Sequence, residues 1–143
     1  MGRKKKVIDV EEYKRDLRKG NVESSPTNYY VPNAILLEEW KVAKAQDAVT
    51  EDLALMFLRI ASKFSNKFKY KYPQDKEDCI EFALLDCLKY WRSFNPEKSA
   101  NPNPFAYFTE LCKNGLAKGW NELGYVDCPI GMRMSISDNL YSI

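Results

Sequence analysis

A run of basic side chains is the first group in this sequence whose type and spacing favour a particular chemistry. No acidic residue interrupts the run, which has a local charge of +5 and consists of Arg59, Lys63, Lys67, Lys69 and Lys71. Clustered amines and guanidinium groups bind the phosphates of nucleic acids. A solvated helix face is the usual role of such a run, so the charges alone leave both interpretations open.

Aromatic rings and amines occur together in a second segment, between Pro104 and Trp120. Its candidate DNA-binding side chains are Phe105, Tyr107, Phe108, Lys113, Asn114 and Lys118. Opening DNA requires the capture of unpaired bases. Aromatic stacking contributes about 1 to 3 kcal/mol per base, while cations hold the backbone. Rings at helical spacing more often pack in a core, and we expect at least Phe108 and Leu111 to face inward.

The sequence contains no constellation for bond chemistry. It has no histidine, no Gly-rich phosphate loop, no GxSxG turn and no paired-carboxylate motif. Its four cysteines form no CxxC pair, so a zinc site is not expected. Cys79, Cys87 and Cys112 fall on apolar helical faces, where reduced cysteine is a small buried hydrophobe. We therefore expect a protein that is not an enzyme and holds no metal or cofactor.

Four helices are expected to position these side chains in one all-α bundle. A chain of 143 residues with 45% hydrophobic residues has the size and apolar content for one core. We expect a basic and polar N-terminal extension at 1–32, a helical domain at 33–124 and a tail at 125–143, both ends being flexible. The helices are expected at 33 to about 46, from 50, from 75, and from 104 to about 123. Their expected N-caps are Asn33, Thr50, Asp75 and Asn103, and Gly124 is the expected C-terminal cap of the last helix.

Two apolar surfaces in this plan suggest partners. The helix from Asp75 has apolar residues over a surface too wide for one amphipathic stripe. The tail ends in apolar residues around an acid: Ile136, Asp138, Leu140, Tyr141 and Ile143. No run reaches the roughly 18 apolar residues of a membrane-spanning helix, so we expect an intracellular protein without a membrane partner.

The order of these features from Leu53 to Trp120 resembles conserved region two of bacterial sigma factors. LALMFLRIASKFSNKF resembles the first helix of that region, and PQDKEDCIEFALLDCLKYWRSFNPE resembles its polymerase-binding helix and the following turn. NPFAYFTELCKNGLAKGW resembles the helix that opens and reads the promoter. The Asn-Pro opening followed by Ala-Tyr, the short length and the lack of a second DNA-binding helix-turn-helix most resemble the late-transcription sigma factors of T-even-type bacteriophages.

This resemblance implies a factor that binds the host RNA polymerase core and directs it to late promoters with an AT-rich minus-ten element. By matching positions, it implies contacts with the polymerase clamp helices at Asp78, Glu81, Phe82 and Leu85. The tail resembles a sliding-clamp-binding segment, which implies contacts at Ile136, Asp138, Leu140 and Tyr141, and a late co-activator is a further implied partner. The implied location is the cytoplasm of the infected bacterial host.

Two points leave alternatives open. Glu110 and Leu111 stand where primary bacterial sigma factors have a tryptophan pair, so the resemblance does not determine how the strands would be opened. Asp78 and Phe82 would equally serve the helix dipole and the core. The alternative function is a polymerase-binding adaptor or co-activator that reads no DNA.

Overall fold

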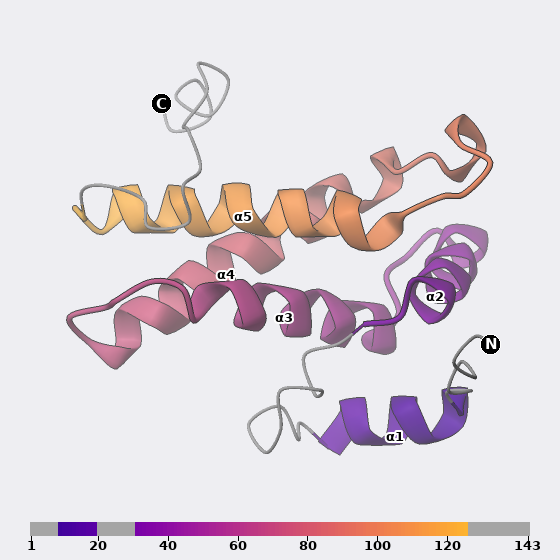
Figure 1. Ribbon diagram of the computed structural model, residues 1–143, viewed down its shortest axis with the longest axis horizontal. Helices are drawn as coiled ribbons and strands as arrows, with labels where there is room; N and C mark the ends of the chain where they lie inside the picture. The colour runs from indigo at the N-terminus through magenta and orange to yellow at the C-terminus, as the bar shows by residue number, and fades with distance from the viewer. Residues whose placement is uncertain (1–8, 20–30, 126–143) are drawn as a thin grey trace, which may run out of the picture.

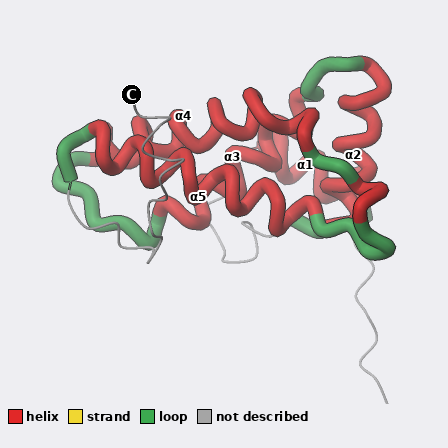
Figure 2. The backbone as a smooth tube through the Cα atoms, turned by 90° about the horizontal axis from the view of Figure 1, so that it is seen from above, coloured by secondary structure: helices red, strands yellow, loops and turns green. Residues whose placement is uncertain are grey.

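The computed structural model describes residues 9–19 and 31–125, and over these ranges the chain folds as an all-α bundle. Three long helices lie lengthwise beside one another (Figures 1 and 2): α3 (Glu51–Ser65), α4 (Pro73–Tyr90) and α5 (Pro104–Glu122). α2 (Asn33–Gln46) lies at the end where α3 and α5 begin, and α1 (Val10–Lys19) packs against α3. Two 3-10 turns, η2 (Trp91–Ser93) and η3 (Pro96–Lys98), precede α5. The predicted fold class is confirmed.

Helix α1 lies in the segment that we expected to be a polar extension. Its only buried residue is Leu17, so a sequence pattern gives little sign of a buried face. Charged residues hold it instead: Lys14 donates to Glu39 at 2.7 Å, and Arg18 donates two hydrogen bonds to Asp52 at 2.9 and 2.7 Å. Long-range ion pairs of this kind leave no periodic pattern, which is why this helix was missed.

Two of the four expected N-caps are confirmed and two are corrected. The Thr50 hydroxyl accepts from the Leu53 N–H at 3.0 Å, and the Asn103 side chain accepts from the Ala106 N–H at 3.0 Å. The Asn33 side chain does not cap its own helix but accepts from the Phe105 N–H at 2.9 Å, which joins α2 to the start of α5. Helix α4 begins at Pro73 rather than Asp75, because proline suits the first helical position.

The tightest packing lies between α4 and α5, where small residues face one another. A Cβ atom at Gly115 would lie 2.4 Å from the Cα atom of Ala83, and one at Gly119 would lie 3.0 Å from the Cα atom of Cys79. The two glycines weaken α5 as an isolated helix, and here they let the two backbones approach. Gly124 follows α5 at a φ of +87°, in agreement with the expected glycine cap.

The core is formed by the facing sides of α2 to α5. The fully buried side chains include Leu36, Leu53, Phe57, Phe108 and Leu116, and Cys79, Cys87 and Cys112 are buried, as expected. Phe108 of α5 faces the core, as expected. Among the described helices, none combines the length and the apolar character required to cross a membrane.

Candidate nucleic-acid interface

Lysines from two helices gather around one aromatic ring. The amines of Lys63, Lys67 and Lys113 lie 5.5, 5.7 and 5.4 Å from the centroid of the Phe64 ring. The Lys63 amine also lies 5.6 Å from the centroid of the Phe105 ring. We call these five residues the Phe64 cluster. The cluster combines amines for phosphates with rings for bases.

The parallel course of α3 and α5 makes this cluster possible. Both helices begin beside α2 and run toward the other end of the bundle (Figure 1). The packing of Phe57 against Phe108, with ring centroids 4.6 Å apart, fixes how the two helices pair. The last turns of α3 are therefore held beside the first half of α5, and residues about 50 positions apart in the sequence share one surface.

The three amines of the Phe64 cluster form a concentrated positive charge. Lys63 and Lys67 are exposed and Lys113 is half-exposed. Within the described residues, the acid pairing of these amines is weak, since Lys113 lies 3.8 Å from the exposed Glu110 carboxylate. Cation–π attraction at an exposed ring contributes about 0.5 to 1 kcal/mol, which leaves the amines free to bind an anion as well.

Arg59 does not belong to this surface, and our placement of it on the exposed basic side was wrong. It is only 3% exposed, and its guanidinium carbon lies 5.3 Å from the centroid of the Tyr13 ring on α1. Its Nε and Nη2 atoms are buried and have no hydrogen-bond partner among the residues that the structure describes. Helix α1, which the sequence did not reveal, covers a residue that helical spacing alone left on the polar side.

Two of the aromatic candidates are held inside the bundle. Phe108 is fully buried, so it cannot meet a base in this fold. Tyr107 donates a hydrogen bond to the Tyr90 carbonyl at 3.1 Å and packs on Phe94, which places it on the α4 side of α5. Burial raises the pKa of Tyr107. Residues two apart on a helix differ by about 200° in direction, so Phe105 and Tyr107 cannot serve one surface.

Two polar candidates on α5 also point away from the Phe64 cluster. The Lys118 amine contacts both oxygens of the Asp86 carboxylate on α4, at 3.0 and 2.8 Å. Because Asp86 is buried, this pair has a structural role that the sequence did not indicate. Asn114 is half-exposed and follows Lys113 by one residue, about 100° around the helix axis.

The remaining lysines extend the positive surface to the far end of the bundle. Lys69 and Lys71 are exposed in the loop between α3 and α4. This loop ends at a pocket of about 370 Å³ between the start of α4 and the end of α5, lined by Lys71, Tyr72, Asp75, Leu123, Gly124 and Tyr125. The basic run thus leads from the Phe64 cluster to a hollow in the surface.

Of the four expected polymerase-binding residues, Glu81 and Leu85 lie on the outer face of α4, whereas the Phe82 ring lies toward Gly119 of α5. Leu85 is 60% exposed and Glu81 is exposed, while Asp78 and Phe82 are half-exposed. Leu88, one turn beyond Leu85, is also exposed. The residues that recur here every three or four positions form one ridge of acidic and apolar side chains, which we call the α4 ridge and which consists of Asp78, Glu81, Leu85 and Leu88.

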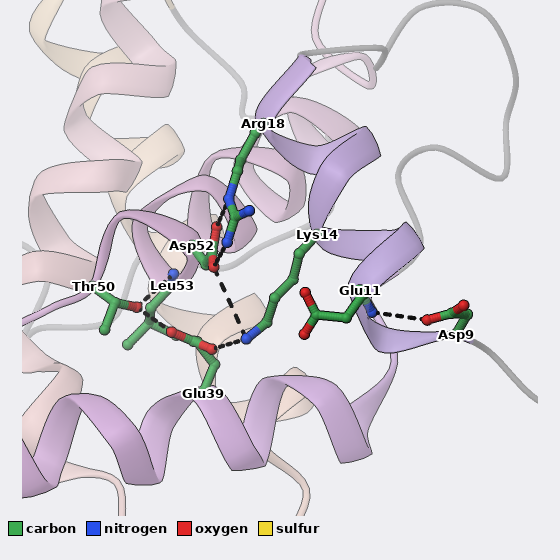
Figure 3. Close-up of polar contacts among 8 residues, drawn as sticks. All are labelled: Asp9, Glu11, Lys14, Arg18, Glu39, Thr50, Asp52 and Leu53. Atoms are coloured by element: carbon green, nitrogen blue, oxygen red, sulfur yellow. Dashed lines mark hydrogen bonds and ion pairs between the residues drawn. The ribbon is translucent and has the colours of Figure 1, made fainter.

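A network of buried charges lies at the opposite end of the bundle from the pocket. Figure 3 shows the Glu39 carboxylate between the Lys14 amine and the Thr50 hydroxyl, with Asp52 beside Arg18. The hydrogen bond from Lys14 to Glu39 raises the pKa of Lys14. Because every group in this network is paired with a protein partner, it supports the packing of α1 rather than a ligand site.

Comparison of the chain with models of known families, with curated proteins and with solved structures gave no match. The tail candidates Ile136, Asp138, Leu140 and Tyr141 lie outside the described residues.

Three residues of these surfaces were missed in the sequence. Phe64 was expected on the core side of its helix, and its partly buried ring does pack against the core, but it also lies among the lysines. Tyr72 and Tyr125 were taken for loop and tail residues, yet both line the pocket. An aromatic residue next to a lysine was the available signal for Phe64 and Tyr72. Tyr125 gave no such signal, because Asp75 is 50 residues away in the sequence and Trp120 is buried in the core.

Proposed function

We propose that this chain is a sigma-type transcription initiation factor that binds a bacterial RNA polymerase core and captures one strand of an opened promoter. The observation that carries the proposal is the Phe64 cluster. Lys63 and Lys67 come from the segment that resembles the first helix of sigma region two, and Phe105 and Lys113 come from the segment that resembles its promoter-reading helix. Two sequence segments with one proposed task meet on one surface.

The α4 ridge supports the polymerase-binding half of the proposal. An exposed leucine flanked by acids on a well-packed helix is a suitable contact for another protein, because the apolar side chain gives affinity and the acids give orientation. The ridge belongs to α4, while the Phe64 cluster belongs to α3 and α5. A polymerase bound at the ridge therefore leaves the lysines free for DNA.

The resemblance to late sigma factors of T-even-type phages extends the proposal to late promoters with an AT-rich minus-ten element. On this proposal the chain acts in the cytoplasm of an infected bacterium, and its tail engages the phage sliding clamp and a late co-activator. A polymerase-binding adaptor that reads no DNA would use the same ridge. It would have no need of the Phe64 cluster, which therefore favours the sigma factor.

The first experiment is co-purification of the chain with bacterial core polymerase, followed by run-off transcription from an AT-rich late-promoter template. Leu85→Lys should remove polymerase association, because it places a charge in an apolar contact. Val42→Lys is the matched control, since Val42 on α2 is similarly exposed, at 51% against 60% for Leu85. Failure of the parent chain to associate with polymerase at micromolar concentration would refute the proposal.

The second experiment tests the Phe64 cluster in the polymerase complex. The triple variant Lys63→Gln, Lys67→Gln, Lys113→Gln should reduce binding of single-stranded promoter DNA. The slope of log affinity against log salt should fall by about 2, since each phosphate contact to a single strand contributes about 0.7. The exposed lysines Lys41, Lys44 and Lys98, changed together to Gln, give the same charge change elsewhere. Equal effects of the two triple variants would favour the adaptor.

A further inference from the structure

The pocket at the far end of the bundle has a rigid aromatic wall. The Tyr125 ring stacks on the Trp120 ring, with centroids 4.0 Å apart and planes 19° apart, and Tyr70 meets both rings edge-on. The Tyr125 hydroxyl donates to the Asp75 carboxylate and accepts from the backbone N–H of Lys71 at 2.8 Å. Three elements therefore fix this ring in place before any ligand arrives.

The polar groups of the pocket offer an acceptor and a cation. The Tyr125 hydroxyl uses its hydrogen on Oδ2 of Asp75, and Oδ1 of Asp75 makes no hydrogen bond to any residue that the structure describes. Burial and the hydrogen bond to Asp75 raise the pKa of Tyr125, so the phenol keeps this hydrogen at neutral pH. The Lys71 amine lies 6.0 Å from the centroid of the Tyr125 ring.

Tyr72 gives the pocket a second aromatic ring, which is largely exposed in the described fold. It is 66% exposed, and only its backbone carbonyl is used, as the acceptor for the Asp75 N–H at 3.0 Å. An aromatic side chain held at a pocket rim without a packing partner is suited to stack on a planar ligand.

The size and position of the pocket limit the ligand. A volume of about 370 Å³ is at the lower end of small-molecule sites, which suits one planar base rather than a longer segment. Lys67 in the Phe64 cluster and Lys71 at the pocket are four residues apart, a separation of at most about 14 Å. A strand bound at the cluster through its phosphates can therefore reach the mouth of the pocket.

We propose that this pocket binds one unstacked nucleobase of the strand held by the Phe64 cluster, a base with an exocyclic amino group that donates to Oδ1 of Asp75. The inference rests on the proposed function and adds a second point of capture to it. Tyr72 and Leu123 cover the base, and Lys71 binds the adjoining phosphate. An aromatic side chain of a partner protein is the competing occupant.

The test uses the full chain bound to core polymerase and a series of single-stranded promoter oligonucleotides, each with one abasic position. One position should weaken binding by about 5-fold or more in the parent chain, the effect of losing one stacked base. In Tyr72→Ala the parent oligonucleotide should bind about 5-fold more weakly, and the same abasic position should have no further effect. Val42→Ala, an exposed apolar change at the other end of the bundle, should behave as the parent.

Two further readouts separate base from backbone. Lys71→Ala should weaken every oligonucleotide of the series by the same factor, because a phosphate contact does not depend on one base. At the sensitive position, thymine should bind more weakly than adenine or cytosine but more tightly than the abasic site, since it keeps the stacked ring and lacks the exocyclic amino group. Thymine that binds as well as adenine or cytosine would overturn the role of Asp75.

The outcomes distinguish the two proposals. Oligonucleotides that bind, with abasic effects identical in the parent and in Tyr72→Ala, would overturn the pocket while leaving the sigma factor proposal intact. Such a result, combined with loss of polymerase association in Tyr72→Ala, would identify the protein side chain as the occupant. Oligonucleotides that do not bind to the polymerase complex would overturn both proposals.

Discussion

The Phe64 ring stands among three amines that repel one another. Its face attracts each of them, with centroid distances of 5.4 to 5.7 Å, and this attraction partly offsets their mutual repulsion. A bound phosphate would offset the repulsion that remains between the amines. The affinity for an anion should therefore belong to the group of lysines, and single substitutions should act less strongly than the triple variant described above.

Arg59 is a charged residue that burial removes from the basic surface. Its Nε and Nη2 atoms have lost water and gained no partner among the described residues, which costs about 1 to 3 kcal/mol per unsatisfied group. We predict that Arg59→Met, which keeps the length of the stem on the Tyr13 ring, leaves the free energy of unfolding unchanged or raises it.

Arg59→Ala is the matched variant, because it also removes the stem. It should lower the free energy of unfolding by about 2 kcal/mol, as expected for a cavity. Urea denaturation measures both values. A loss in Arg59→Met as large as that in Arg59→Ala would show that the guanidinium itself stabilises the fold.

At the scale of elements, the α4–α5 interface reverses the ordinary effect of glycine. Alanine at position 115 should favour an isolated helix by about 1 kcal/mol. We predict that Gly115→Ala instead lowers the free energy of unfolding by about 3 kcal/mol, because the new Cβ would lie 2.4 Å from the Ala83 backbone.

Gly119→Ala is the internal comparison for this prediction. Its nearest neighbours lie at 3.0 to 3.1 Å and include the side chains of Phe82 and Cys79, so we expect a loss of about 1 kcal/mol. Chemical denaturation should rank position 115 as the more sensitive. The reverse order would mean that the two helices are further apart than described.

Helix α1 should dock through its charges. We predict that Lys14→Met exposes the amides of α1 to hydrogen exchange while the amides of α3 to α5 stay protected, because Glu39 loses its buried partner. Arg15→Met, on the exposed side of the same helix, should leave exchange unchanged.

The pH dependence of α1 docking follows from the direction of the pKa shift. Glu39 raises the pKa of Lys14 above its ordinary value. The stabilisation is therefore complete below the ordinary lysine pKa and is lost as the pH rises through the shifted one. Protection of α1 that falls between pH 6 and 8 in the parent chain would contradict this assignment.

At the scale of the whole molecule, the bundle has two ends with different chemistry. At one end α2 meets the start of α3 through the hydrogen bond from Thr50 to Glu39 and the start of α5 through Asn33, and its Trp40 indole donates to the Trp91 carbonyl of η2 at 2.9 Å. At the other end Tyr125, whose ring stacks on Trp120, lines a pocket together with Tyr72 and Asp75. The first end is closed by contacts within the protein, and the second carries the pocket proposed to bind a base.

The buried thiols report on the folding of the whole bundle. The sulfur atoms of Cys87 and Cys112 lie 3.5 Å apart in the core. The hydrogen bond with Cys87 and burial raise the pKa of Cys112 well above its ordinary value. We predict that Cys79, Cys87 and Cys112 resist a thiol reagent in the native chain and are labelled only at the rate of global unfolding. Peptide mapping by mass spectrometry measures this labelling.

The raised pKa of Cys112 also predicts a pH dependence. The contribution of the protonated thiol to the free energy of unfolding should be fully present below the ordinary thiol pKa and should be lost as the pH rises through the raised one. Rapid labelling of Cys112 at pH 7 in the native chain would contradict its place in the core.

The sequence alone determined the class of the fold, most helix bounds and the absence of motifs for bond chemistry. Local physics explains this success: Thr50 and Asn103 cap their own helices, and apolar residues at steps of three or four mark the faces that become buried. The same local patterns identified Lys63, Lys67, Phe105 and Lys113 as candidates for one interface.

Only the tertiary structure decided which candidates lie together. Whether Arg59 is covered by α1, whether Lys118 pairs with Asp86 and whether Phe64 faces lysines from two helices all depend on contacts between residues distant in the chain. Such contacts have no sequence period, because they arise from how the helices cross and not from the turn of any one helix.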